Sequence, residues 1–236
     1  MMIAVAGMVG SGKSTLARAL ATRFGLNLAL ESVDDDNPWL PLFYADPDNR
    51  KRYALHLQLH FLATRFRSLR QMRGRGGSWV LDRTWYEDAE VFVRGLVEQG
   101  LLAPLEHGLY HRLYAELLHA PAARPPRLLI YLYGSLDTIV RRIETRGRPT
   151  EQGVEREYWA RLHARYREWI REFRHCPVLS LDVTEYDIVG DPDAIEEIAS
   201  LVRLRLEGEL PQTDLWPATP RRARGSWREL PSGHEP

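Results

Sequence analysis

The chain has 236 residues, enough for one domain with a substantial core or for one domain with an appendage. Its 32 Lys and Arg residues balance 32 Asp and Glu residues, and this zero net charge argues against a nucleic-acid or membrane-surface protein. The single cysteine, Cys176, excludes an internal disulfide, and no apolar stretch is long enough to span a bilayer. Because the chain also enters its first predicted strand at once, without a leader segment, we expect a cytosolic protein.

Short apolar runs alternate with helical patterns along the chain, which is typical of a parallel sheet with helices on both faces. Strands are expected at 2–7, 27–31, 78–82, 127–133 and 177–182. Helices are expected from the end of the first strand's loop to Phe24, and over about 50–70, 86–99, 104–119 and 191–207. One more helix carries an aromatic and leucine stripe that predicts core packing: Tyr158, Leu162, Tyr166, Trp169 and Phe173. The sequence therefore predicts a three-layer α/β domain with a five-stranded parallel sheet over 1–207, followed by a mobile tail rich in Pro and Arg over 208–236.

The segment after the first strand reads GMVGSGKST and has the spacing of a phosphate-binding P-loop. Its glycines let backbone N–H groups close around phosphate oxygens, and the following helix adds the partial positive charge of its N-terminus. Lys13 would reach the β- and γ-phosphates of a nucleoside triphosphate, and the Ser14 hydroxyl would bind Mg²⁺. Lysine occurs at only one other position, Lys51, so a lysine here stands out against a background of arginine. The predicted cofactor-binding residues are Gly7, Val9, Gly10, Ser11, Gly12, Lys13, Ser14 and Thr15.

A P-loop alone indicates only nucleotide binding, so the acceptor must be inferred from charged residues that follow the other strands. Glu31 ends the second predicted strand, and Asp82 and Arg83 follow the third. A carboxylate beside a P-loop suits a hydroxyl acceptor, which must lose its proton as the phosphoryl group arrives, whereas a phosphate acceptor needs extra cations. Glu31 therefore favours an alcohol substrate, although a surface glutamate at a strand end is the alternative interpretation.

An arginine-rich run after the fourth strand indicates a lid over about 142–153. Arg142 and Arg146 lie one helical turn apart, and Arg148 follows Gly147, where the chain can turn. Arginines that close over a transferring phosphoryl group stabilise its charge and exclude water. The alternative is a solvated basic helix end that complements the helix dipole.

From the P-loop to about residue 190 the chain resembles the deoxynucleoside kinases, the family of deoxycytidine, deoxyguanosine and deoxyadenosine kinases. The resemblance rests on Glu31-Ser32-Val33, Asn37-Pro38, Phe43-Tyr44-Ala45-Asp46-Pro47, Gln58 with Arg65, Leu81-Asp82-Arg83-Thr84 with Glu87-Asp88, and Arg142-Ile143-Glu144-Thr145-Arg146-Gly147-Arg148 with Glu151. Within the family the pattern looks most like the bacterial deoxyadenosine kinases.

The resemblance implies a role for each acidic and basic residue around the reacting groups. Glu31 would be the general base on the 5′-hydroxyl, and Arg83 would hold the 5′-oxygen and the transferring phosphate. Asp82 would organise Mg²⁺ together with Ser14. A homodimer is implied as well, through the long helices.

The resemblance also implies a nucleoside site. Tyr44 and Glu151 would bind the 3′-hydroxyl, Gln58 would read the edge of the base, and the ring of Phe92 would stack on it. Arg65 and Asp88 match members that accept deoxycytidine or purine deoxynucleosides. Without the resemblance, core packing would explain Phe92, and a surface ion pair would explain Arg65 and Asp88.

The sequence therefore predicts a kinase that uses ATP and Mg²⁺ to phosphorylate the 5′-hydroxyl of a deoxynucleoside, with deoxyadenosine first and deoxyguanosine or deoxycytidine next. Two alternatives stay open. A nucleoside monophosphate kinase resembling thymidylate kinase shares the P-loop, the Asp-Arg motif and the lid, and a non-catalytic ATP-binding sensor would need only the P-loop.

Overall fold

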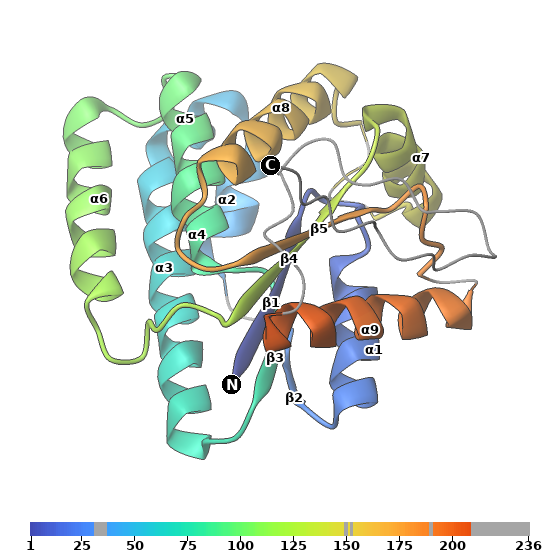
Figure 1. Cartoon of the computed structure of the whole chain (residues 1–236). Coiled ribbons are helices and arrows are strands. Elements are labelled where there is room, and N and C mark those ends of the chain that lie inside the picture. The colour runs from blue at the N-terminus through green and yellow to red at the C-terminus, as the bar shows by residue number, and fades with distance from the viewer. Residues whose placement is uncertain (31–36, 149–150, 152, 189–190, 209–236) are drawn as a thin grey trace, which may run out of the picture.

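A five-stranded, fully parallel sheet forms the centre of the computed structural model (Figure 1), which describes residues 1–30, 37–148, 151, 153–188 and 191–208. The strand order is β2-β3-β1-β4-β5. The strands are β1 (Met2–Gly7), β2 (Asn27–Ala29), β3 (Trp79–Asp82), β4 (Leu128–Tyr133) and β5 (Val178–Asp182). The prediction of five parallel strands is confirmed.

The central strands are apolar because helices cover both of their faces. Ile3, Val5 and Ile130 are completely buried in β1 and β4. The edge strand β2 is shorter than the predicted 27–31 and ends at Ala29. Glu31 lies outside the described residues, so its proposed role as the base stays a prediction from sequence.

The helices over the described residues are α1 (Lys13–Phe24), α2 (Trp39–Ala45), α3 (Pro47–Arg75), α4 (Trp85–Glu87), the π-helix η1 (Asp88–Val93), α5 (Arg94–Glu98), α6 (Pro104–Leu118), α7 (Leu136–Arg146), α8 (Arg156–Glu172) and α9 (Pro192–Glu207). Helix α1 packs against β1 and β3 and against α9, whereas α3, α6 and η1 pack together at the left of Figure 1. Within the described part of the chain, no helix combines the length and the apolar character needed to cross a membrane.

Two helices differ from the prediction for local reasons. Helix α3 starts earlier than residue 50 because the Asp46 side chain accepts a hydrogen bond from the Asn49 N–H (2.8 Å) and Pro47 fits the first turn. Helix α2 was not predicted, since its seven residues are too few to show a helical repeat.

The predicted helix over 86–99 is three consecutive segments, α4, η1 and α5. Thr84 caps its start: the Thr84 hydroxyl accepts from the Glu87 N–H, and the Glu87 carboxylate accepts from the Thr84 N–H. A π-helix has a wider turn than an α-helix and is frequent at functional sites. This one carries Asp88 and Phe92, both assigned to the nucleoside site.

The aromatic stripe predicted to pack in the core does so. Leu162, Tyr166, Trp169 and Phe173 are each at most 3% exposed, and Tyr158 is half-buried against them. Helix α9 ends at Glu207 with Gly208 as its C-cap, and from residue 209 onward the predicted tail lies outside the described residues.

Candidate active site

The P-loop connects β1 to α1 and its glycines are sterically required. Gly7 has φ 144°, and a Cβ there would lie 2.4 Å from the Leu132 carbonyl oxygen. At Gly10 (φ 80°) a Cβ would lie 2.7 Å from the Ile143 side chain of α7. Gly12 has φ 95°. Only glycine fits the backbone at these positions, and the absence of side chains there lets phosphate oxygens approach the loop.

The N-terminus of α1 completes the phosphate cradle. No side chain caps it, because the N-cap residue is Gly12, so its first N–H groups are available to an anion. The Lys13 ammonium donates to the Met8 carbonyl oxygen (3.1 Å), which holds it across the loop, while Ser14 and Thr15 are exposed. The donor set matches a triphosphate and its metal ion.

Asp82 is the last residue of β3 and pairs with Val5 in the sheet, which places it and Arg83, the first residue of the following turn, beside the P-loop. Asp82 is 5% exposed, and its Oδ1 has no hydrogen-bond partner among the described residues. Such a buried carboxylate oxygen fits a ligand of Mg²⁺ or of its bound water. Arg83 has φ 79°, and among the described residues it is the only non-glycine with a positive φ. Strained backbone of this kind clusters at functional sites.

Asp88 holds two arginines in a buried cluster. Its Oδ1 lies 2.8 Å from Arg83 Nη2 and its Oδ2 lies 3.0 Å from Arg65 Nε, and the Asp88 side chain is 3% exposed. The Arg83 guanidinium also lies over the Phe92 ring, 4.1 Å from its centroid. The pair of Arg65 and Asp88 is therefore not a surface ion pair. The sequence did not reveal that Arg83 joins it.

Two further buried residues are relevant to a nucleoside site, Gln58 of α3 and Tyr110 of α6. Gln58 is 5% exposed and lies on α3 two turns before Arg65. Tyr110 of α6 is 1% exposed, and the described residues offer its hydroxyl no hydrogen-bond partner. Burial raises the Tyr110 pKa, Asp88 adds to the increase, and Arg83 and Arg65 oppose it. The sequence reasoning missed Tyr110, because a tyrosine within an amphipathic helix carries no distinguishing signal.

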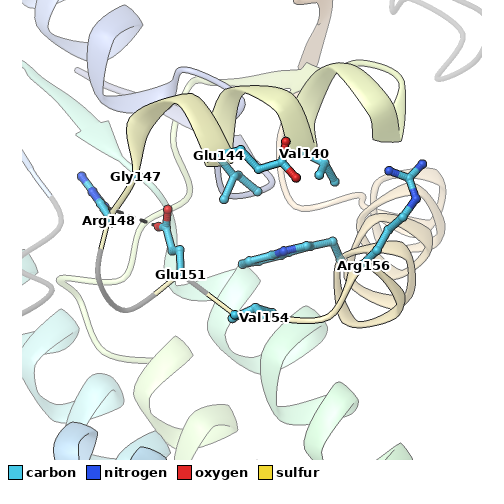
Figure 2. A pocket seen from close by; sticks show the side chains of 10 residues that line it. Val140, Glu144, Gly147, Arg148, Glu151, Val154 and Arg156 are labelled. Carbon is cyan, nitrogen blue, oxygen red and sulfur yellow. Dashed lines mark ion pairs between the residues drawn. The ribbon is translucent and has the colours of Figure 1, made fainter.

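The predicted lid arginines have two different partners in this structure, a carbonyl oxygen for Arg142 and the Glu151 carboxylate for Arg146 and Arg148. Arg142 donates to the Val183 carbonyl oxygen (2.8 Å), Arg146 lies 2.5 Å from the Glu151 carboxylate and Arg148 lies 4.0 Å from it. Figure 2 shows Arg148 and Glu151 facing each other at one end of a pocket of about 310 Å³ between α7, the lid and the start of α8. Residues 149, 150 and 152 of the lid lie outside the described residues.

The two residues assigned to the 3′-hydroxyl, Tyr44 and Glu151, are not bonded to each other in the described part of the chain. Glu151 binds the lid arginines, and its Oε2 is buried without a partner there. Tyr44 is 53% exposed, yet desolvation raises the pKa of its hydroxyl to about 12. Tyr158 adds to the increase, and Arg50 and Arg83 oppose it.

Glu87 is a site residue that sequence reasoning missed as such. In the sequence it was part of the motif that resembles the family, with no role assigned to it. In the structure it is completely buried, and its carboxylate accepts a hydrogen bond from Gly7 of the P-loop. The capping-box spacing of Thr84 and Glu87 was readable in the sequence and predicts a helix start. It does not predict that the carboxylate also reaches the P-loop, which comes from the pairing of β1 with β3.

Four features together define a P-loop kinase. They are the parallel sheet, the P-loop after its first strand, the Asp-Arg pair at the end of β3 and the arginine-bearing lid. The model of the deoxynucleoside kinase family matches residues 3–206. The chain belongs to that family and is a deoxynucleoside kinase.

Curated relatives match nearly the whole chain. It is 41% identical over 201 residues to a deoxyadenosine/deoxycytidine kinase of Bacillus subtilis (strain 168), covering 85% of this chain and 91% of that protein. It is 36% identical over 220 residues to a deoxyguanosine kinase of Lactobacillus acidophilus, covering 89% and 93%. A solved structure of deoxyadenosine kinase from M. mycoides with bound dATP aligns with a TM-score of 0.71 at 25% identity, covering 86% of this chain and 100% of that chain.

Proposed function

We propose that this deoxynucleoside kinase transfers the γ-phosphoryl group of ATP, with Mg²⁺, to the 5′-hydroxyl of deoxyadenosine by preference, and to deoxyguanosine or deoxycytidine next. The observation that supports this preference is the buried cluster of Arg65, Asp88 and Arg83 over Phe92. The names of the relatives, which include deoxyadenosine and deoxyguanosine kinases, agree with it.

The cluster suits a polar base that presents both donors and acceptors. A buried carboxylate accepts from an amino group, and a guanidinium donates to a ring nitrogen or a carbonyl. Gln58 adds an amide that does both, and Phe92 adds a stacking surface. Arg83 now lies on the Phe92 ring, so a base that stacks there displaces it. We propose that the displaced guanidinium turns to the 5′-oxygen and the phosphates.

Phosphoryl transfer follows from the remaining residues. Glu31 would take the proton of the 5′-hydroxyl as the bond to phosphorus forms. Lys13, Arg83 and the lid residues Arg142, Arg146 and Arg148 would neutralise charge on the phosphoryl oxygens. Ser14 and Asp82 would hold Mg²⁺, which would neutralise charge on the donor phosphates.

The lid would exchange partners as it closes. Glu151 now neutralises Arg146, and with Tyr44 it is assigned to the 3′-hydroxyl. If the sugar takes the Glu151 carboxylate, Arg146 is released toward the phosphates. Nucleoside binding and lid closure would then be coupled through one carboxylate.

The family resemblance also supports a homodimer, and α6 offers a surface for it. Leu105, Leu109 and Leu113 form one stripe along this helix and are 86%, 44% and 42% exposed. Spacing of four residues places them on one face, where a second copy would cover them. We propose that the enzyme acts as this dimer, in the cytoplasm.

An Asp88→Asn variant tests the nucleoside site. The amide keeps the size of the side chain but removes the charge between two guanidiniums that are 14% and 16% exposed. We expect kcat/KM for deoxyadenosine to fall by roughly 10²-fold, because both guanidiniums lose the opposite charge and the amide nitrogen cannot accept a hydrogen bond from one of them. We also expect the free energy of unfolding to fall by about 3 kcal/mol, measured by urea titration.

The matched control is Asp137→Asn, which removes another aspartate paired with an arginine, Arg156, but on the surface. It should leave both quantities unchanged. Retention of full kcat/KM for deoxyadenosine by Asp88→Asn would contradict the assignment of this cluster to the base.

A further inference from the structure

The Glu87 carboxylate is hydrogen-bonded to three separate parts of the chain next to the P-loop. Its Oε1 accepts from the Gly7 N–H (3.3 Å) and from the Tyr166 hydroxyl (3.0 Å). Its Oε2 accepts from the Thr84 N–H (2.8 Å) and the Thr84 hydroxyl (3.2 Å). The carboxylate therefore links the first glycine of the P-loop, the turn after β3 and the helix α8.

The electrostatics of Glu87 involve the same two cations that the mechanism assigns to phosphate. Complete burial raises the pKa of its carboxyl, and Arg83 and then Lys13 are the first groups that oppose this, ahead of the N–H groups of Thr84 and Gly7. A buried carboxylate needs such compensation to stay ionised. In return, an ionised Glu87 attracts Lys13 and Arg83 toward the P-loop, where its carboxylate bonds to Gly7.

Glu87 lies between two backbone segments that have unfavourable conformations, one at Gly7 and the other at Arg83. Gly7 has φ 144° and no room for a Cβ, and Arg83 has φ 79°. Strained residues persist only when their neighbours determine them. Arg83 is held on one side by its N–H bond to the Val5 carbonyl (2.9 Å) and on the other by the bonds of Thr84 to Glu87.

We propose that Glu87 is a positioning residue for the phosphate donor, which sets Gly7 and the Arg83 turn at a fixed separation and draws Lys13 and Arg83 to the donor side of the site. The proposal rests on the proposed function only in calling the bound anion a donor triphosphate. It differs from a general base or metal ligand, because Glu87 is completely buried and acts through Gly7, Thr84, Lys13 and Arg83.

The test compares Glu87→Gln with Glu90→Gln. Glu90 lies one turn further along and is also a multiply bonded carboxylate, with Trp169 Nε1 at 2.7 Å, His175 Nε2 at 3.0 Å and the Tyr114 hydroxyl at 3.4 Å. None of these three partners belongs to the P-loop or to the turn after β3. The same chemical change is thus made at two carboxylates, only one of which contacts the phosphate cradle.

The first readout is the binding of inorganic tripolyphosphate, which has no base or sugar, by titration calorimetry. Glu87→Gln should weaken it at least about 10-fold, since the loss of a hydrogen bond to a charged group corresponds to a factor of this size. The KM for ATP–Mg²⁺ should rise by a similar factor, and the KM for deoxyadenosine, which depends on Glu87 only through Arg83, should rise by less. Glu90→Gln should leave all three constants unchanged, even if it lowers the melting temperature.

Unchanged tripolyphosphate binding by Glu87→Gln would overturn the proposal, and so would equal weakening by both variants, which would mark a general loss of stability. If Glu87→Gln does not fold, Tyr166→Phe takes its place. It removes one donor to Oε1, and should weaken tripolyphosphate binding about 3-fold; unchanged binding would again overturn the proposal. Tripolyphosphate binding requires no nucleoside. An error in the proposed nucleoside specificity would therefore change the turnover of wild-type enzyme with different nucleosides, but would not change the tripolyphosphate result.

Discussion

A Lys13→Met variant is expected to lose at least about 10³-fold in kcat while it still folds and binds nucleoside. Lys13 is half-buried at the first position of α1, and its ammonium lies across the P-loop against the Met8 carbonyl. Methionine has a similar length and is unbranched, so the packing of the aliphatic part is kept. The variant loses the positive charge that stabilises the γ-phosphoryl group during transfer. The measurement is kcat with saturating ATP–Mg²⁺ and deoxynucleoside.

The chain supplies its own control, because its second lysine lies elsewhere. Lys51 is exposed on α3, and Lys51→Met should leave kcat within about 2-fold of wild type. If Lys13→Met kept more than a tenth of the wild-type kcat, the P-loop would not be the site of phosphoryl transfer.

A Glu31→Gln variant is expected to lower kcat by about 10²- to 10⁴-fold, the usual contribution of a general base. The amide keeps the shape of the side chain and one acceptor oxygen but does not take up the 5′-hydroxyl proton. Deoxynucleoside binding, measured directly as Kd, should therefore stay within about 3-fold of wild type. Near-full kcat in Glu31→Gln would remove the base role and with it the preference for an alcohol acceptor.

Much of the fold could be predicted from sequence, because strands that are buried on both faces read as continuous apolar runs. β1 and β4 are such strands, and their predicted bounds differ from the observed ones by at most one residue. Helix α2 could not be predicted, since seven residues around Pro41 show no repeat. The π-helix η1 could not be predicted either, because α- and π-helical turns give the same apolar pattern over six residues.

The donor half of the candidate site was readable because the P-loop is local: one loop supplies nearly all of its groups. The nucleoside half depends on contacts between distant segments. The pair of Arg65 and Asp88 was suggested by resemblance, but the contact of Arg83 with Asp88 and Phe92 requires the left-handed turn at Arg83. The contact of Glu87 with Gly7 spans eighty residues and exists only because β1 and β3 are neighbours in the sheet.

The most direct test is the initial rate with ATP–Mg²⁺ against deoxyadenosine, deoxyguanosine, deoxycytidine, thymidine and deoxyadenosine monophosphate at matched concentrations. We expect 5′-phosphorylation of the nucleosides, with deoxyadenosine fastest and thymidine slowest, and no turnover of the monophosphate. Turnover of the monophosphate alone would contradict the role of Glu31 and the assignment of Arg65, Asp88 and Phe92 to a nucleoside.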